Sequence, residues 1–434
     1  MSPDKVALTY EGVDVTFAEL AERVNEQAVR LREQGVRPGD RVAYLGQNHP
    51  AAVETLFAAA LAGAVYLPLN ARLTRAELDH ILADATPSAL VTGPGYEDLD
   101  LPAVERGVKP PDDVCLIMYT SGTTGRPKGA MLTHANLTWN VFNHLIDIDL
   151  RGDDVVLVTA PLFHIAALAQ SFLPAFIKGA RSVILPAFDA DRVLETVERE
   201  RVTAMFGVPA MFSFIAQSPH WAGADLTSLR LLECGGAPVP EPLIHAYQAR
   251  GLTFLQGYGM TEAAPGVLYL GAEDSVRKAG TAGVPAFFTD VTLDEGEILV
   301  RGPNVFAGYW GQPPHEGWFR SGDLAERDDE GFYRVVGRVK DMIISGGENI
   351  YPAEVESALL THPDIVDCAV VGVPDDRWGE VGKAFLVARR PVEPAEVLAH
   401  LDGRLARYKI PKYVEFVAEL PRTASGKITK WKLT

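Results

Sequence analysis

The sequence has 434 residues, of which 47% are hydrophobic and 22% are charged, and its formal net charge is −17. A chain of this length can bury the cores of two or three domains, and its composition is that of an ordinary globular protein. The acidic balance argues against a nucleic-acid binder, because such proteins carry basic surfaces. It leaves small anionic ligands open, since a local group of lysines can dominate its own pocket.

The three cysteines, Cys115, Cys234 and Cys368, are odd in number and far apart in the chain. We therefore expect buried thiols in a reducing compartment and no disulfide framework. The first residues lack a basic stretch followed by an apolar one, and the most apolar stretch, residues 51–69, contains Glu54 and Pro68. We expect neither a signal peptide nor a transmembrane segment, and a cytoplasmic location.

Helical and strand patterns alternate through the N-terminal part. Two capping boxes, each a threonine followed three residues later by a glutamate, precede apolar residues at helical spacing and begin at Thr16 and Thr74. Between them, Pro50 opens another helix. Short strands are predicted at residues 42–45, 65–67 and 89–91. This alternation predicts an α/β architecture with parallel strands.

Residues 119–130 read YTSGTTGRPKGA and follow an apolar run, residues 115–118, that predicts a buried strand. Glycines let a backbone turn tightly and bring its N–H groups to an anion, while hydroxyls and a lysine add donors and charge. The combination favours a polyphosphate ligand over a solvated polar turn. It is not a P-loop, because no Gly-Lys is followed by Ser or Thr at that spacing. A second short segment precedes the helix that Thr133 caps, so the loop lies between two strands.

Two later strands end in residues that could face a ligand. Residues 155–160 run into Pro161-Leu162-Phe163-His164, where the histidine either faces a cavity or is a satisfied structural group. Residues 231–232 run out into Cys234-Gly235-Gly236-Ala237-Pro238, which leaves space for a flat ligand or acyl chain, or forms a tight turn. Strands at residues 182–185 and 204–206, with a helix between them, and a helix opening at Pro209 complete this part.

Residues 254–262 read FLQGYGMTE. Two glycines bracket Tyr258, so its ring can lie against an open face, as adenine stacking would need. Glu262 follows on what we expect to be the first turn of a helix. Beside a phosphate loop its carboxylate suits Mg²⁺, which prefers one or two carboxylates together with phosphate oxygens. Taken alone, it would be an acid at a helix N-terminus.

Four motifs occur in the order YTSGTTGRPKGA, GYGMTE, SGDLAERDDEGFYRVVGRVKDMIISGGENIYPAEVE and PRTASGK. Together they resemble the adenylate-forming superfamily of acyl-CoA synthetases, peptide-synthetase adenylation domains and luciferases, and they are most similar to acyl-CoA and fatty-acid-CoA ligases. The resemblance covers the whole chain. It implies a large N-terminal domain of α/β layers with a β-barrel-like part, residues 1–339, and a small mobile C-terminal α+β domain, residues 340–434. The hinge would be Lys340.

The resemblance also implies two half-reactions with ATP, Mg²⁺ and coenzyme A. A carboxylic acid is joined to AMP with release of pyrophosphate, and a thiol then takes the acyl group. Thr120 and Glu262 would position Mg²⁺, Asp323 would accept from the ribose hydroxyls, and Lys427 would bridge the attacking carboxylate and the α-phosphate. Without the other motifs, Lys427 would read as a solvated tail residue. Further nucleotide contacts would come from Ser121, Gly122, Thr123, Thr124, Gly125, Lys128, Gly236, Ala237, Pro238, Gln256, Gly257, Tyr258, Gly259, Met260, Thr261, Val335 and Arg338.

The resemblance also implies which residues contact the acyl group and the thiol. His164 would be a catalytic residue beside Lys128, Glu262 and Lys427, lying at the acyl side near the path of the thiol. The expected acyl wall is His164, Val208, Met211, Gly235, Gly236 and Met260. Coenzyme A would pass Gly346, Gly347 and Glu348, because glycines leave room for a narrow thiol arm.

The chain is more compact than most members of the superfamily. Residues 292–297 predict a tight hairpin, and residues 310–318 lack a helical insert, so we expect trimmed surface loops. The acceptor is left open between coenzyme A and a carrier-protein phosphopantetheine, whereas the intact motifs disfavour a non-enzymatic nucleotide binder. Phe163-His164-Ile165 lacks the aspartate that amino-acid adenylation needs. An aliphatic or aryl monocarboxylic acid fits best, since no arginine is placed to meet a second carboxylate. The chain length of the acid and the oligomeric state stay open.

Overall fold

The computed structural model describes residues 2–97, 110, 113–120, 127–422 and 428–433. Five residues predicted to contact phosphate, Ser121, Gly122, Thr123, Thr124 and Gly125, lie outside the described residues, and so does Lys427. No helix in the described part is long and apolar enough to cross a membrane.

The N-terminal α/β layer is built on a six-stranded sheet of the described chain with the order β17-β7-β6-β4-β3-β5. Its first four strands in sequence are parallel, and β7 returns antiparallel to β6, so the phosphate loop joins two paired strands as predicted. Both predicted capping boxes are present. The elements are α1 (Phe17–Glu33), β3 (Arg41–Gly46), α2 (Pro50–Leu61), β4 (Val65–Asn70), α3 (Arg75–Ala85), β5 (Ala89–Thr92), β6 (Val114–Thr120), β7 (Lys128–Thr133), α4 (His134–Asp147) and β17 (Gly308–Tyr309).

A nine-stranded sheet forms the second layer of the described chain, with the order β14-β13-β12-β11-β10-β8-β9-β1-β2. Its central strands, from β1 to β12 across the sheet, are parallel, and their carboxyl ends share one edge. The strands are β1 (Val6–Tyr10), β2 (Val13–Thr16), β8 (Val155–Val158), β9 (Arg181–Ile184), β10 (Ala204–Gly207), β11 (Leu231–Cys234), β12 (Phe254–Gly259), β13 (Gly266–Tyr269) and β14 (Val284–Pro285). The associated helices are a π-helical segment η1 (Ala167–Phe172), α5 (Leu173–Lys178), α6 (Ala190–Glu200), α7 (Pro209–Gln217), α8 (Glu241–Gln248) and the 3₁₀ turn η2 (Thr261–Ala263).

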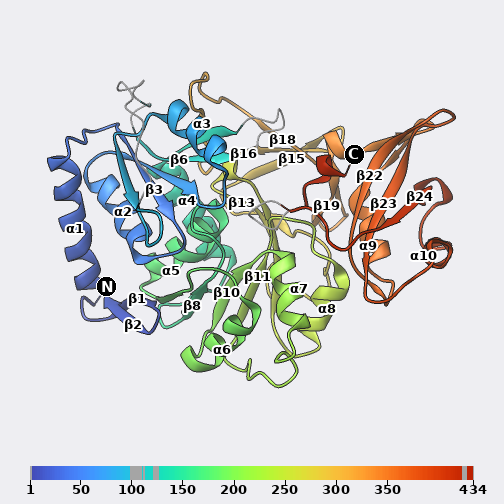
Figure 1. Cartoon of the computed structure of the whole chain (residues 1–434), viewed down its shortest axis with the longest axis horizontal. Coiled ribbons are helices and arrows are strands. Elements are labelled where there is room, and N and C mark those ends of the chain that lie inside the picture. Colours follow the sequence, from blue (N-terminus) through green and yellow to red (C-terminus); the bar gives the residue numbers. More distant parts are fainter. Residues whose placement is uncertain (1, 98–109, 111–112, 121–126, 423–427, 434) are drawn as a thin grey trace.

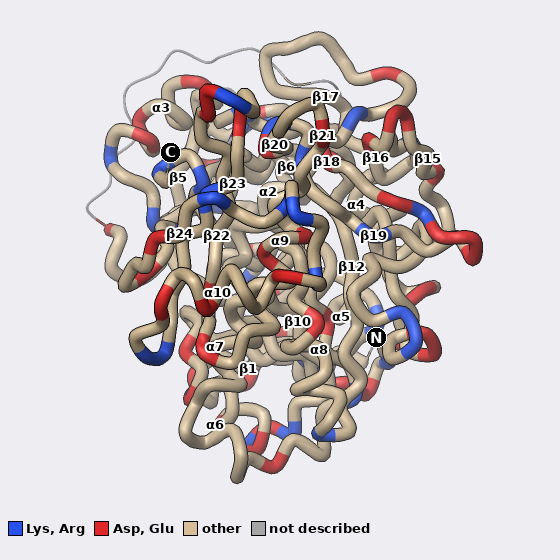
Figure 2. The backbone as a smooth tube through the Cα atoms, turned by 90° about the vertical axis from the view of Figure 1, so that its right-hand side faces the viewer, with Lys and Arg blue, Asp and Glu red and all other residues tan. Residues whose placement is uncertain are grey.

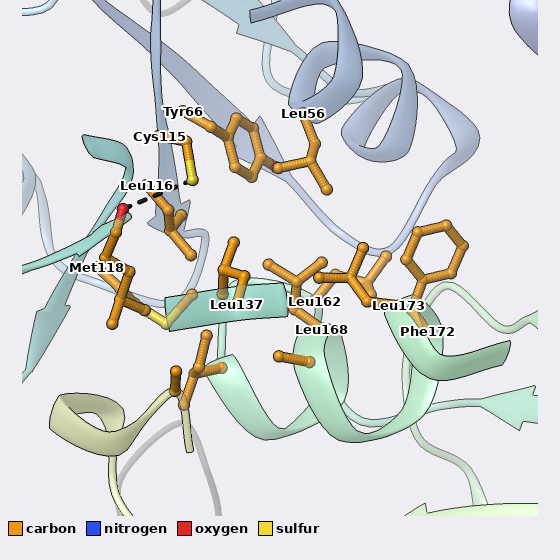
Figure 3. Close-up of a cluster of buried hydrophobic side chains, with 14 of the residues drawn as sticks. Leu56, Tyr66, Cys115, Leu116, Met118, Leu137, Leu162, Leu168, Phe172 and Leu173 are labelled. Atoms are coloured by element: carbon orange, nitrogen blue, oxygen red, sulfur yellow. Dashed lines mark hydrogen bonds between the residues drawn. The ribbon is translucent and has the colours of Figure 1, made fainter. Parts of the chain in front are cut away.

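One large buried cluster joins these two layers. Figure 3 shows Leu116 and Met118 of β6 facing Leu137 of α4 and, beyond it, Leu168 and Phe172 of η1. Burying such side chains stabilises the fold by roughly 1.5–3 kcal/mol each.

The cysteines behave as predicted. Cys115 lies in the same cluster, and its thiol donates to the carbonyl oxygen of Leu132 over 3.5 Å (Figure 3). Burial raises the pKa of Cys115 to about 12, and it also raises the pKa values of Cys234 and Cys368. All three are buried, free thiols and therefore poor nucleophiles.

The β-rich part of the larger domain is an antiparallel four-stranded sheet of the described residues, β15-β16-β18-β19. The predicted hairpin at residues 292–297 is present, because Glu295 and Gly296 have φ of +50° and +85° and connect two paired strands. No helix occurs within residues 310–318, all of which are described, in agreement with the shortened connection. The strands are β15 (Asp290–Asp294), β16 (Glu297–Arg301), β18 (Phe319–Arg327) and β19 (Tyr333–Arg338).

The C-terminal part forms a smaller α+β domain with its own core (Figure 1). Strands β21-β20-β23-β22 pair in that order, and β24 adds to β23. Lys or Arg positions are interspersed with Asp or Glu positions over the face seen in Figure 2. The chain thus has a large N-terminal domain and a smaller C-terminal one, as predicted. The elements are the 3₁₀ turn η3 (Val339–Asp341), β20 (Ile343–Ser345), β21 (Glu348–Ile350), α9 (Pro352–Leu359), β22 (Ile365–Asp375), β23 (Gly379–Ala388), α10 (Pro394–Leu401) and β24 (Tyr413–Phe416).

Candidate active site

The β6–β7 hairpin holds the two described ends of the phosphate loop. Thr120 and Lys128 are cross-strand partners in the antiparallel ladder, so the hydroxyl and the ammonium start from neighbouring positions. Tyr119, just before the loop, donates a hydrogen bond from its hydroxyl to Asp84 at the end of α3. Side chains of β6 and β7 pack in the large buried cluster that joins the two sheets, so these strands form a rigid base for the loop.

Tyr309 links the lysine of this hairpin to Glu262. Its hydroxyl donates to Oε1 of Glu262 over 2.7 Å, and Nζ of Lys128 lies 5.2 Å from the centroid of its ring. The backbone brings these groups together, because β17 pairs with β7 and the N–H of Phe306 donates to the carbonyl oxygen of Glu262 over 2.8 Å. Burial, together with the Glu262 carboxylate, raises the pKa of Tyr309, so the phenol remains a donor. Glu262 lies in the 3₁₀ turn η2 and not in the longer helix that we expected.

Thr120, Lys128 and Glu262 form a donor set that fits Mg²⁺ with a polyphosphate. One carboxylate and one hydroxyl leave most positions of an octahedral ion to phosphate oxygens and water, which is how Mg²⁺ is usually held. Tyr309 fixes one carboxylate oxygen, which orients the group without neutralising its charge. When bound, the ion would neutralise phosphate charge. Sequence motifs did not single out Tyr309, because the residue lies outside the four motifs and reaches the site through the β17–β7 pairing.

Asp323 and its partners form the second part of the candidate nucleotide site. Asp323 is 5% exposed, and its carboxylate accepts from the Tyr258 hydroxyl over 2.8 Å and from Nε of Arg338 over 2.7 Å. Asp323 and Arg338 are partners across the β18–β19 ladder. A carboxylate has about four lone-pair positions, so two remain for ribose hydroxyls. Three residues that were predicted separately as nucleotide contacts are therefore joined by direct contacts.

Two of the glycines predicted to contact the nucleotide are also required by the backbone geometry. A Cβ on Gly259 would lie 2.0 Å from the carbonyl oxygen of Pro265, so the close pairing of β12 with β13 excludes any side chain there. Gly236 follows β11 with φ of +82°, a left-handed conformation that favours glycine. Ala237 and Pro238 continue this loop, Met260 follows β12, Thr261 begins η2, and Val335 is a half-buried residue of β19.

The acyl candidates are not all in one place. Gly235 lines a small cavity at the carboxyl ends of β10, β11 and β12, together with Phe206, Gln256 and Gly257. Met211 belongs to a buried core cluster that also contains Phe206, and Val208 packs against that cluster. Met260 packs against the cluster that joins the two sheets. His164 is half-buried after β8, and its ring lies 4.8 Å from that of Phe163.

Gln256, which was predicted as a nucleotide contact, is one of the residues around this cavity, and its Nε2 atom is buried and makes no hydrogen bond to the described residues. Glu233, Gln170 and Tyr269 also line the cavity, and none of them was singled out from the sequence. Residues 136, 140, 143 and 144 of α4 are polar and buried, although their spacing is that of a helix face that packs on the core. This row of polar residues on the core-facing side of α4 was the sequence signal from which a buried polar site could have been predicted.

The candidate coenzyme A residues form the turn between β20 and β21. Gly346 and Gly347 have φ of +61° and +88°, and a Cβ on Gly346 would lie 2.6 Å from Cε3 of Trp378. Both glycines are therefore required by the turn itself. Glu348 is exposed. Lys340, the hinge candidate, is an exposed residue of η3, between the last strand of the four-stranded sheet and the C-terminal sheet.

Comparison with known proteins assigns the chain to a family. The AMP-binding enzyme model matches residues 1–108 and 97–310, and the model of the AMP-binding enzyme C-terminal domain matches residues 354–427. A feruloyl-CoA synthase of an Amycolatopsis species is 54% identical over 468 residues, which cover 99% of this chain and 95% of the relative. An indoleacetate–CoA ligase of Aromatoleum aromaticum is 42% identical, with 99% of this chain and 94% of the relative covered.

Solved structures agree. The o-succinylbenzoate CoA synthetase of Bacillus subtilis in complex with its acyl-adenylate is 34% identical, with a TM-score of 0.89 and with 100% of this chain and 96% of that chain covered. The same synthetase has also been solved with ATP and a magnesium ion.

The chain belongs to the AMP-binding enzyme family. Within it, the protein is an ATP-dependent acyl-CoA synthetase that uses ATP, Mg²⁺ and coenzyme A. It activates a carboxylic acid as acyl-AMP with release of pyrophosphate, and it then transfers the acyl group to coenzyme A. The class predicted from the four motifs is thereby confirmed.

Proposed function

We propose that the acid activated by this synthetase is aromatic, of the arylpropenoic class to which ferulate belongs. The observation that carries the proposal is the identity of 54% with a feruloyl-CoA synthase over nearly the full length of both chains. The sheet edge beside the small cavity supports it, because the bare backbones of Gly235 and Gly257 and the ring of Phe206 offer flat surfaces to a planar group there.

The roles of individual residues are part of the proposal. Lys128 and the loop hydroxyls hold the β- and γ-phosphates, Thr120 and Glu262 hold Mg²⁺, and Asp323 accepts from the ribose. Their support is the contact chain from Lys128 through Tyr309 to Glu262 and the Tyr258–Asp323–Arg338 cluster. Positive charge beside developing negative charge lowers the barrier to adenylation.

Lys427 bridges the carboxylate of the acid and the α-phosphate, and His164 lies at the acyl side near the thiol. The domain beginning at Lys340 rotates between the two half-reactions, which brings the Gly346-Gly347-Glu348 turn to the thiol when Lys427 withdraws. The exposed position of Lys340 between two sheets supports this division. We also propose a cytoplasmic location, which three free buried thiols favour.

A panel of acids tests the substrate class. Purified protein with ATP and Mg²⁺ is given ferulate, cinnamate, octanoate and palmitate, and pyrophosphate release is measured with and without coenzyme A. We expect the two aryl acids to have a kcat/KM at least about tenfold above that of either fatty acid. A fatty acid whose kcat/KM exceeds that of both aryl acids would overturn the proposal. If the adenylate reacted with a carrier-bound phosphopantetheine but not with coenzyme A, the acyl acceptor would be the carrier protein.

A further inference from the structure

The helix α4 carries large apolar side chains on its solvent side. Four of its polar side chains are instead buried, namely those of residues 136, 140, 143 and 144. Trp139, Phe142 and Ile146 follow one another at intervals of three and four residues, so they lie in one row along the helix. Phe142 is 42% exposed and Ile146 is 52% exposed. A surface helix ordinarily directs its apolar row to the core and its polar residues to water, and α4 departs from that pattern on both sides.

Two phenylalanines of the loop before β15 extend this row. Phe287 and Phe288 are 67% and 37% exposed, and their ring centroids lie 4.9 Å apart. Trp139 joins the loop to the helix, because its ring meets that of Phe288 at 4.9 Å and that of Phe142 at 5.8 Å, both edge to face. The aromatic face thus consists of Trp139, Phe142, Ile146, Phe287 and Phe288.

Buried hydrogen bonds hold the loop in this position. Asn143 of α4 is fully buried, its Oδ1 accepts from the N–H of Phe288 over 2.8 Å, and its Nδ2 donates to Oγ1 of Thr289 over 3.0 Å. The Thr289 hydroxyl donates in turn to Oδ1 of Asn304 over 2.9 Å. A satisfied buried network fixes one geometry, so the two phenylalanine rings are held in the solvent by the fold itself.

The area of the aromatic face matches the core of a protein interface. Since an aromatic side chain has about 150–250 Å² of surface, the exposed parts of these side chains amount to roughly 400 Å². Two such faces packed together would remove roughly 800 Å² of apolar surface from water. Because about 60% of an interface is apolar, the whole interface would measure roughly 1,300 Å², which lies in the range of stable complexes.

Charge distinguishes the surfaces that could cover the aromatic face. The chain has a net charge of −17, yet residues 134–146 and 284–289 contain no Asp, Glu, Lys or Arg. Lipid surfaces in cells are anionic and are bound through Lys and Arg beside an apolar face, which these two segments lack. An uncharged face is where two copies of an acidic chain meet with the least repulsion.

We propose that the protein forms a two-fold symmetric dimer in which the aromatic faces of two copies pack together. A two-fold interface uses the same patch on both copies, so α4 runs antiparallel to α4 of the second copy. Phe142, in the middle of the row, then lies at the axis and meets the same residue of the second copy. The dimer goes beyond the proposed function and does not depend on which acid is activated.

The mass of the purified full chain in solution tests the dimer. Size-exclusion chromatography with light scattering is run at about 10 μM protein and about 0.3 M NaCl, where repulsion between acidic chains is screened. We expect twice the 47.0 kDa of one chain. The mass of a single chain under these conditions would overturn the proposal.

Charged variants assign the interface to α4. Phe142→Glu and Phe142→Lys each place like charges against one another at the axis, so we expect each variant alone to be a monomer. Mixed in equal amounts, the two variants bring opposite charges together and regain the dimer, which contact with a lipid surface or an unrelated protein would not produce. Phe214→Glu is the matched control, because Phe214 is an exposed phenylalanine of α7 outside the aromatic face.

Phe287→Ser keeps the test decisive if the charged variants fail to fold, which pyrophosphate release detects. It removes one ring without adding charge, and we expect the dissociation constant from sedimentation equilibrium to rise at least about tenfold. A dimer that all these variants leave intact, or a mixture that stays monomeric, would overturn the proposal. Binding of a monomeric protein to vesicles of phosphatidylcholine with about one quarter phosphatidylglycerol, lost in Phe287→Ser, would instead identify a membrane-binding face and overturn it equally.

Discussion

Tyr309 is the residue on which the two halves of the proposed phosphate and metal site meet. Its hydroxyl holds one oxygen of Glu262, while its ring lies beneath the ammonium group of Lys128. A phenol can serve both at once because its edge carries the donor and its face carries the negative potential that attracts a cation. Tyr309 is therefore a positioning residue for two charged side chains of opposite sign.

Replacing Tyr309 with phenylalanine keeps the ring and removes only the donor to Glu262. Because a hydrogen bond to a charged group contributes about 1.5–3 kcal/mol, we expect the Mg²⁺ concentration for half-maximal adenylation to rise by roughly 10-fold or more. Titration of Mg²⁺ at saturating ATP and acid, read by pyrophosphate release, measures this. Tyr413→Phe on the exposed part of β24 is the control. An unchanged Mg²⁺ dependence in Tyr309→Phe would separate the tyrosine from the metal site.

At the scale of elements, local sequence chemistry explains where most helices begin. The capping boxes at Thr16 and Thr74, the proline at the start of α2 and the threonine before α4 were all readable, because each acts within one helical turn. Contacts between elements that are distant in the chain could not be predicted from such local patterns. Tyr309 meets Glu262 through the pairing of β17 with β7, and His144 meets Glu233 between α4 and β11. The motifs identified the residues that we propose contact ATP, but not the residues that hold those side chains in place.

Thr16→Ala tests the first capping box. The Thr16 hydroxyl accepts from the N–H of Glu19 over 3.2 Å, and the loss of such a cap typically costs about 1 kcal/mol. We expect urea unfolding of the N-terminal domain to shift to a lower midpoint with an unchanged slope. Thr16→Ser keeps the hydroxyl and should restore most of the stability. A midpoint for Thr16→Ala equal to that of the unaltered protein would mean that packing alone fixes the start of α1.

At the scale of the whole molecule, two domains of unequal size are joined at a short 3₁₀ turn. The larger one contains the contacts from Lys128 to Glu262 and the Asp323 cluster, whereas the turn proposed for coenzyme A belongs to the smaller one. Alternation between two positions of the small domain would let one site serve two reactions. The order of the domains followed from the motifs, while their separate cores required the structure.

Lys340→Pro tests the hinge. Proline fixes its own φ near −65° and restricts the residue before it, so the backbone at η3 loses the freedom that rotation needs. We expect the first adenylation to stay within about threefold of the unaltered rate, while thioester formation from bound adenylate slows by at least roughly tenfold. Rapid-quench measurement of each half-reaction gives both rates, with Lys340→Ala as the control that keeps backbone freedom. Normal thioester formation in Lys340→Pro would place the hinge elsewhere.

The turn at Gly346 has a consequence for how natural variation in this family is to be understood. Its handedness and the indole of Trp378 each exclude a side chain, independently of any ligand. Selection on folding alone would therefore keep glycine there, even in a descendant that had lost its thiol substrate. The exposed Glu348, two positions later, is free of both constraints, so its replacement among relatives would report on the acceptor.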